Sequence, residues 1–294
     1  MLESDVFVAG GATPARARIL NTIAILGAGE LGAALARRLA DREAAGRVLL
    51  IDPELGRARG KALDIRQSGP IEGSDTQVEG CASLIEAGPA DVVVWTDAPG
   101  AAAASVQELA SRLGKAMLVV ACDEPSLVEL AVAAGVPRAR AFGSAPLAWS
   151  AALRGRLAEA LRAAPREVAA VLLGRSPHDL VLPRESATLG GIPIDRVSAG
   201  ACRTALEGLR GRTLGPAALA AAAARAIEGL GQARLSVLPL TAWLDGEYGH
   251  RGVALAVPAQ LSRRGLQGVL EVPLDPVDRV AFDRAAQHAL DARR

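Results

Sequence analysis

The fold of this 294-residue chain is decided by one stretch: Ile23-Ala-Ile-Leu26, then Gly27-Ala-Gly29-Glu-Leu-Gly32, an alanine-rich run, and Val48-Leu-Leu-Ile51-Asp52. The short apolar runs predict two buried strands, and the alanine-rich run between them predicts a helix. The sequence therefore predicts a strand, a glycine turn, a helix and a second strand that ends in a carboxylate. This order of elements is typical of a dinucleotide-binding unit.

The three glycines of the turn are predicted to have different roles. Gly27 permits a tight turn at the end of the strand, Gly29 lets a pyrophosphate approach the backbone, and Gly32 lets the helix pack closely against the strand. The amides at the start of the helix would face the phosphates, and the helix dipole would favour their negative charge. The alternative interpretation is an ordinary turn between a strand and a helix, with no ligand.

Asp52 follows Gly32 by 20 residues, where a carboxylate can accept hydrogen bonds from the ribose hydroxyls. The same carboxylate would repel a 2′-phosphate, so the sequence predicts binding of NAD in preference to NADP. The agreement of strand, helix and acid favours the dinucleotide over the plain turn. The predicted cofactor-binding residues are Gly27, Ala28, Gly29, Glu30, Leu31, Gly32, Asp52 and Thr96.

Composition argues against several other classes of protein. Lys and Arg number 33 against 32 for Asp and Glu, and no basic stripe indicates a nucleic-acid partner. No apolar run is long enough to predict a membrane span, and the first 20 residues lack the apolar core of a signal peptide. Three scattered cysteines, Cys81, Cys122 and Cys202, favour reduced thiols in a cytoplasmic protein over a disulfide framework or a metal site.

Strand and helix signals alternate through the first half, which predicts an α/β fold with a Rossmann-type, doubly wound parallel sheet. The second half predicts a mixed α+β lobe, with antiparallel strands near its end. The expected division is an extension over residues 1–20, an NAD-binding domain over 21–145 and a C-terminal domain over 146–294. Specific expectations are helices over 56–68, 106–114, 150–163, 200–211, 216–229 and 276–293, and strands over 117–121, 168–173 and 180–182.

Several segments resemble the lactate and malate dehydrogenase family, and the malate branch most closely. The resemblance implies hydride transfer between NAD and a 2-hydroxy acid, a histidine held by an aspartate, arginines that bind substrate carboxylates and a mobile lid. It also implies a homodimer or homotetramer that uses the helix over residues 61–67. The segments that carry it are Ile25–Gly32, Gly60–Gly73, Val168–Pro193, Ser236–Gly249, Val253–Val257 and Val269–Pro273.

The residues that would carry this chemistry differ from the family pattern. Ser176 falls on the place of the catalytic histidine, and His178 lies two residues further on. Trp149 falls on the place of the aspartate, and Ala152 on that of a substrate arginine. Ser176 and His178 are therefore only weak catalytic candidates, and His178 has the simpler interpretation of a solvated loop residue.

The lid and the end of the fourth strand differ as well. The lid segment, residues 97–105, contains no arginine and is shorter than in the family, so we expect an open cleft. The family's asparagine after the strand is replaced by acids in Asp123-Glu124-Pro125. Asp97, Asp123 and Glu124 near one cleft would repel a dicarboxylate.

Two functional hypotheses follow from these departures. In the first, the chain binds NAD or only keeps the fold, and has little or no malate dehydrogenase activity. In the second, it is an active NAD-dependent oxidoreductase on a different substrate that is not a dicarboxylate. The sequence identifies no such substrate.

Overall fold

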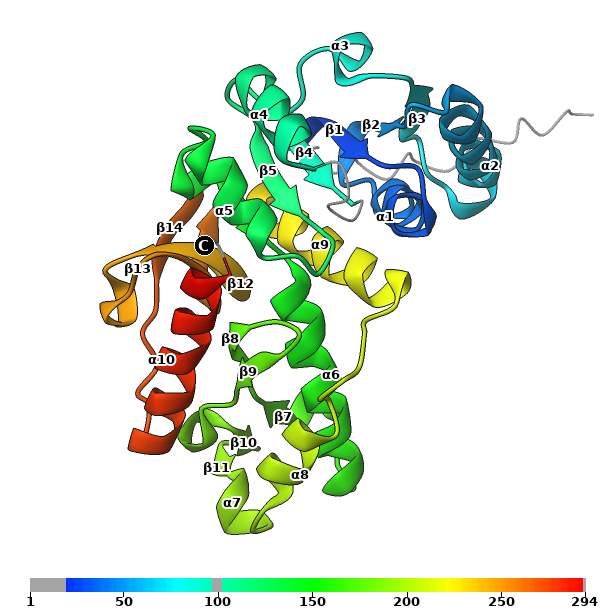
Figure 1. Cartoon of the computed structure of the whole chain (residues 1–294). Helices are drawn as coiled ribbons and strands as arrows, with labels where there is room; N and C mark the ends of the chain where they lie inside the picture. The colour runs from blue at the N-terminus through cyan, green and yellow to red at the C-terminus, as the bar shows by residue number, and fades with distance from the viewer. Residues whose placement is uncertain (1–19, 97–101, 293–294) are drawn as a thin grey trace, which may run out of the picture.

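The computed structural model describes residues 20–96 and 102–292 (Figure 1). The predicted extension over residues 1–20 lies outside this range, apart from Leu20. So do Asp97 and the start of the predicted lid segment. In the described part of the chain, no helix is both long and apolar enough to cross a bilayer.

A parallel sheet forms the first half, as predicted. The strand order β3-β2-β1-β4-β5-β6 changes direction between β1 and β4. Open α/β sheets bind ligands at the carboxyl ends of the two strands that flank such a switch point. Each strand is a short, mostly apolar run, as expected for a sheet that is covered on both faces. The strands are β1 (Leu20–Leu26), β2 (Ala45–Ile51), β3 (Gln77–Cys81), β4 (Val92–Trp95), β5 (Met117–Val120) and β6 (Ala141–Gly143).

Helices cover both faces of this sheet, which confirms the predicted doubly wound α/β class. The alanine-rich α9 (Pro216–Gly231) comes from the second half of the chain but lies beside α1 in Figure 1. Its Ala223 and Ile227 are fully buried in the same apolar cluster as Leu35 of α1. The helices of the first half are α1 (Glu30–Asp41), α2 (Leu55–Glu72), α3 (Leu84–Ala87), α4 (Ala102–Arg112) and α5 (Ser126–Ala133).

The sheet continues into the second half of the chain, where its strands become antiparallel. Gly143 of β6 pairs with Thr241 of β12, so one sheet runs across residue 145. The added strands are β12 (Ser236–Asp245), β13 (Arg251–Ser262), β14 (Gly265–Val269), β8 (Leu173–Arg175) and β9 (Asp179–Val181).

The remaining elements pack around these strands. A small separate sheet has the order β11-β10-β7. Its strands are Ile192–Pro193, Thr188–Leu189 and Val168–Ala169. The helices are α6 (Ala145–Ala160), α7 (Ile194–Val197), α8 (Ala201–Glu207) and α10 (Pro276–Asp291), with 3-10 helices over Arg138–Arg140, Pro165–Glu167, Arg184–Ser186 and Glu247–Gly249.

Several predicted elements differ in extent from those observed, among them the helices expected over residues 106–114, 150–163 and 200–211, and two differences have a clear physical reason. The single strand expected over residues 168–173 is two strands in different sheets, because the amide of Leu172 donates to Ser150 Oγ at 3.1 Å instead of joining a ladder. The helix expected over residues 56–68 spans Leu55–Glu72 and includes Pro70. Pro70 lacks an N–H and so removes one hydrogen bond near the C-terminal end of the helix, but the helix continues past it, and left-handed Gly73 (φ 73°) ends it instead.

Candidate functional site

The glycine turn has the geometry of a phosphate cradle. Gly27 has φ 102°, a conformation that favours glycine, and its amide donates to the Ile51 carbonyl at 2.8 Å. A Cβ on Gly32 would lie 1.9 Å from the Gly27 carbonyl oxygen, so only glycine lets α1 approach the turn this closely. A Cβ on Gly29 would meet nothing within 4 Å, which leaves open space above the start of α1. The residues present therefore fit a pyrophosphate.

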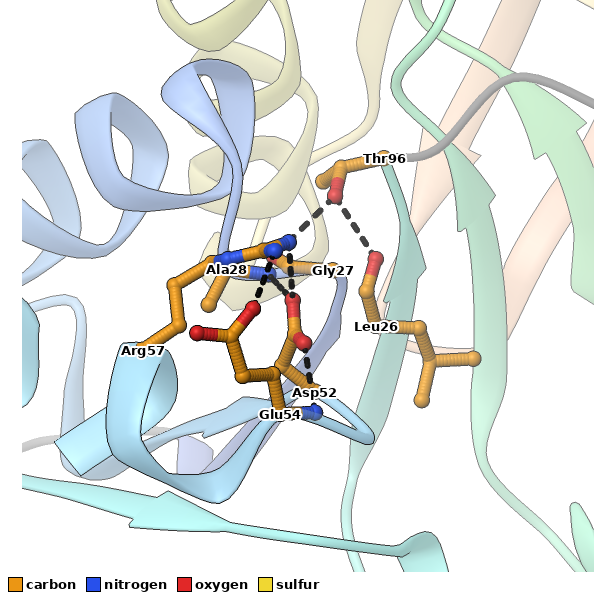
Figure 2. Close-up of polar contacts among 7 residues, drawn as sticks. All are labelled: Leu26, Gly27, Ala28, Asp52, Glu54, Arg57 and Thr96. Carbon is orange, nitrogen blue, oxygen red and sulfur yellow. Dashed lines mark hydrogen bonds and ion pairs between the residues drawn. The ribbon is translucent and has the colours of Figure 1, made fainter.

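Asp52 at the end of β2 is fixed against this turn (Figure 2). Its Oδ2 accepts from the amide of Ala28 at 3.0 Å, and its Oδ1 accepts from the amide of Glu54 at 2.9 Å. The Arg57 guanidinium lies 3.4 Å from Oδ2 and also pairs with Glu54. With a side chain only 7% exposed, Asp52 is held in one orientation at the edge of the turn.

Thr96 joins the carboxyl ends of β1 and β4. Its hydroxyl donates to the Leu26 carbonyl at 2.6 Å and lies 3.3 Å from the Gly27 carbonyl (Figure 2). Glu30 is exposed in the first turn of α1, and Leu31 packs partly buried against apolar residues of α6 and α9. The structure thus brings the eight predicted cofactor-binding residues together around one turn.

Three residues predicted separately form one hydrogen-bonded network at the carboxyl end of β5. Trp149 Nε1 donates to Asp123 Oδ2 at 2.7 Å, and Ser176 Oγ donates to Asp123 Oδ1 at 2.5 Å. Trp149 is fully buried and Ser176 is 5% exposed. Each Asp123 oxygen is therefore occupied by a donor from a different element, α6 in one case and the turn after β8 in the other.

Arg175, which directly precedes Ser176, forms an ion pair with Glu129 that the sequence analysis did not predict. Arg175 Nη1 lies 2.8 Å from Glu129 Oε1, and the two side chains are 15% and 7% exposed. Glu129 Oε1 also accepts from the amide of Ala254 on β13 at 3.1 Å. Glu129 thus joins α5, β8 and β13, and it fixes the start of the turn that carries Ser176.

Comparison with known proteins identifies the family. No family model matches the chain. A malate dehydrogenase of Xanthobacter autotrophicus is 32% identical over 90% of this chain and 93% of its own length. A malate dehydrogenase of Thioalkalivibrio sulfidiphilus is 29% identical over 90% and 96%. This chain belongs to the lactate/malate dehydrogenase family. A solved malate dehydrogenase from Salinibacter ruber agrees, with a TM-score of 0.85, 28% identity and coverage of 92% of this chain and 95% of its own.

Two further residues singled out against the family pattern lie outside the Asp123 network. His178 is exposed and forms no hydrogen bond with another described residue, and it borders a cavity of about 260 Å³ between β9, α8 and α10. Ala152 packs against the apolar cluster that contains Leu153 and Leu157. The described residues therefore do not bring His178 and Ser176 together as a hydrogen-bonded pair.

The three cysteines form no disulfide with one another: Cys81 and Cys122 are partly buried, and Cys202 is buried. Burial, with Asp195 nearby, raises the pKa of Cys202 to about 11, so this thiol stays protonated at neutral pH. Within residues 20–96 and 102–292, no group of three or more His, Cys, Asp or Glu residues is arranged to hold a metal ion.

Asp123 predicts a pH effect on stability. Burial raises the pKa of Asp123 above its ordinary value of 3.8, while the bonds from Ser176 and Trp149 oppose this rise and Glu124 adds to it. A raised folded-state pKa favours the protonated, folded form, so this contribution to stability is full below pH 3.8 and declines as pH rises through the folded-state value.

Asp123→Asn removes this titration. The quantity compared is the free energy of unfolding of the wild type minus that of the variant. We expect this difference to decrease as pH increases from 3.8, and then to become constant. Urea unfolding at a series of pH values measures this difference. A difference that does not change with pH, or that increases with pH, would contradict the assignment.

Proposed function

We propose that this member of the lactate/malate dehydrogenase family binds NAD(H) at the turn from Gly27 to Gly32 and has little or no malate dehydrogenase activity. The observation that supports the second part is the Asp123 network. The two residues predicted on the places of the catalytic histidine and its aspartate, Ser176 and Trp149, both donate to one carboxylate. Neither can act there as the imidazole base that removes a hydroxyl proton in the family.

Charge at the carboxyl end of β5 supports the same conclusion. Asp123 and the adjacent Glu124 lie where the family pattern has an asparagine, and Ala152 packs in an apolar cluster on the place of a substrate arginine. A dicarboxylate would meet like charge without a bidentate guanidinium to compensate it. We therefore expect poor binding of malate and oxaloacetate.

The coenzyme end supports NAD binding. Gly29 leaves open space at the start of α1, and Asp52 is oriented by the Ala28 and Glu54 amides beside that space. These residues would hold the pyrophosphate and the adenosine ribose, while the nicotinamide would supply the hydride chemistry.

Calorimetric titration tests the coenzyme assignment. We expect the full chain to bind NADH with a 1:1 stoichiometry and more tightly than NADPH, because Asp52 repels a 2′-phosphate. Titrations of Asp52→Asn and of Glu167→Gln, an exposed acid on the other half, provide the test variant and its control. No binding of either coenzyme, or equal affinity for both, would contradict the proposal.

A second candidate is an active oxidoreductase on a neutral or cationic carbonyl compound. Two observations on His178 support it. The side chain is exposed at the edge of a cavity, and its charge acts to lower the pKa of the Asp123 carboxyl. NADH oxidation with such a compound that is lost in His178→Ala would favour this function over the first.

We also propose that the chain is cytoplasmic and assembles as a homodimer or homotetramer through α2. This helix exposes large apolar side chains that a partner subunit would cover. Leu63 is 45% exposed and Ile71 is 87% exposed.

A further inference from the structure

Arg57, in the first turn of α2, lies against the predicted ribose site instead of extending into solvent (Figure 2). One guanidinium nitrogen is 3.4 Å from Asp52 Oδ2, and another pairs with Glu54. The Arg57 and Glu54 side chains are 48% and 64% exposed, whereas Asp52 is 7% exposed. The arginine can therefore move at little cost, and the aspartate cannot.

The hydrogen bonds of Asp52 show why this movement matters. A carboxylate has about four acceptor positions. The amides of Ala28 and Glu54 occupy two of them, and Arg57 occupies a third. A ribose that donates through both its 2′- and 3′-hydroxyls needs two acceptor positions. Arg57 must therefore leave Asp52 before the carboxylate can hold both hydroxyls.

We propose that Arg57 sets the selectivity between NAD and NADP: when a coenzyme binds, its guanidinium moves from Asp52 to the substituent on the ribose 2′-carbon. This inference rests on the proposed binding of NAD(H) at the same turn. An arginine beside this position accommodates a 2′-phosphate in related dinucleotide sites, and guanidinium and phosphate form bidentate, charge-assisted hydrogen bonds.

The local charges set the direction and the limit of the effect. Asp52 and Glu54 together carry two negative charges against one positive charge on Arg57, so NAD remains the preferred coenzyme. Glu54 competes with a phosphate for the guanidinium. Arg57 therefore reduces the discrimination against NADP that Asp52 alone would impose, and Glu54 limits this reduction.

The test compares the dissociation constants of NADH and NADPH in four forms of the full chain, by calorimetry. Arg57→Ala should weaken NADPH binding and leave NADH binding unchanged or tighter, since it frees an acceptor on Asp52. The NADPH-to-NADH ratio of dissociation constants should rise about tenfold, the effect of losing one charge-assisted hydrogen bond. Glu54→Gln should lower the ratio about threefold by releasing Arg57. Arg59→Ala is the control and should leave the ratio unchanged, because exposed Arg59 lies on the same helix and its side chain forms no hydrogen bond or ion pair with another described residue.

The outcomes separate this inference from the proposed function. A wild type that binds NADH, with a ratio that stays the same or falls in Arg57→Ala, overturns the role of Arg57 alone. A ratio that rises equally in Arg59→Ala overturns it too, because a general loss of positive charge would then suffice. A wild type that binds neither coenzyme overturns both proposals. A cooperative thermal unfolding transition establishes that each variant is folded. Glu54→Gln tests the Arg57–Glu54 contact in a chain that keeps Arg57.

Discussion

Reduction of oxaloacetate by this chain with NADH is expected to be slower than about 10⁻¹ s⁻¹. Enzymes commonly turn over near 10 s⁻¹, and loss of a positioned acid–base group costs about 10²–10⁴-fold. Here Ser176 and Trp149 both donate to Asp123, so neither is available as a base at the places where the family resemblance predicts the proton-handling pair. The rate of NADH absorbance loss at saturating oxaloacetate measures this turnover.

A malate dehydrogenase of the family serves as the positive control in the same buffer. Turnover of about 1 s⁻¹ or more by the present chain would place it in the ordinary range of enzymes and contradict the prediction. A slower rate that persists in both Ser176→Ala and Asp123→Asn would show that the network is not where the residual reaction occurs.

Glu129→Ala is expected to lower the free energy of unfolding by about 3 kcal/mol, because it leaves the largely buried Arg175 guanidinium without its partner. The Ala254 amide would lose its acceptor as well. Urea unfolding followed by circular dichroism measures the change. Glu129→Gln, which keeps the shape and an acceptor oxygen, should lose less.

Glu167→Ala is the matched control for this measurement. Glu167 pairs with Arg166 on the surface, where the two side chains are 52% and 85% exposed, and exposed pairs contribute only about 0–1 kcal/mol. A loss in Glu129→Ala no larger than in this control would show that the Arg175–Glu129 pair does not hold the turn after β8 in place.

Local patterns were sufficient to predict the nucleotide-binding half. The strand, turn and helix from Ile23 to Gly32 follow from short-range periodicity and from glycines whose steric need is local. The position of Asp52 follows from the length of the helix between two strands. These features depend on neighbours in sequence, and the structure confirms the fold class that they predict.

The substrate end was predicted residue by residue but not as a network. The family resemblance put Ser176 and Trp149 on the places of the catalytic pair, and Asp123 was treated separately as an acid that would repel the substrate. The indole N–H of Trp149 and the hydroxyl of Ser176 are hydrogen-bond donors, and the carboxylate of Asp123 has two acceptor oxygens. This match of two donors to one carboxylate could have predicted the network. The Arg175–Glu129 pair, 46 residues apart, carried no such signal, because nothing local relates α5 to β8.

One fluorescence experiment tests both the binding of NADH at the coenzyme site and the proposed lack of malate dehydrogenase chemistry at the substrate site. NADH is titrated into the full chain until the fluorescence of the bound coenzyme saturates, and oxaloacetate is then added in excess. We predict a saturable increase in fluorescence that does not decay within the first seconds after the addition. Failure to saturate would show that the coenzyme site is not functional. A decay of the bound signal within seconds would show that the substrate site turns over oxaloacetate, and would contradict this account.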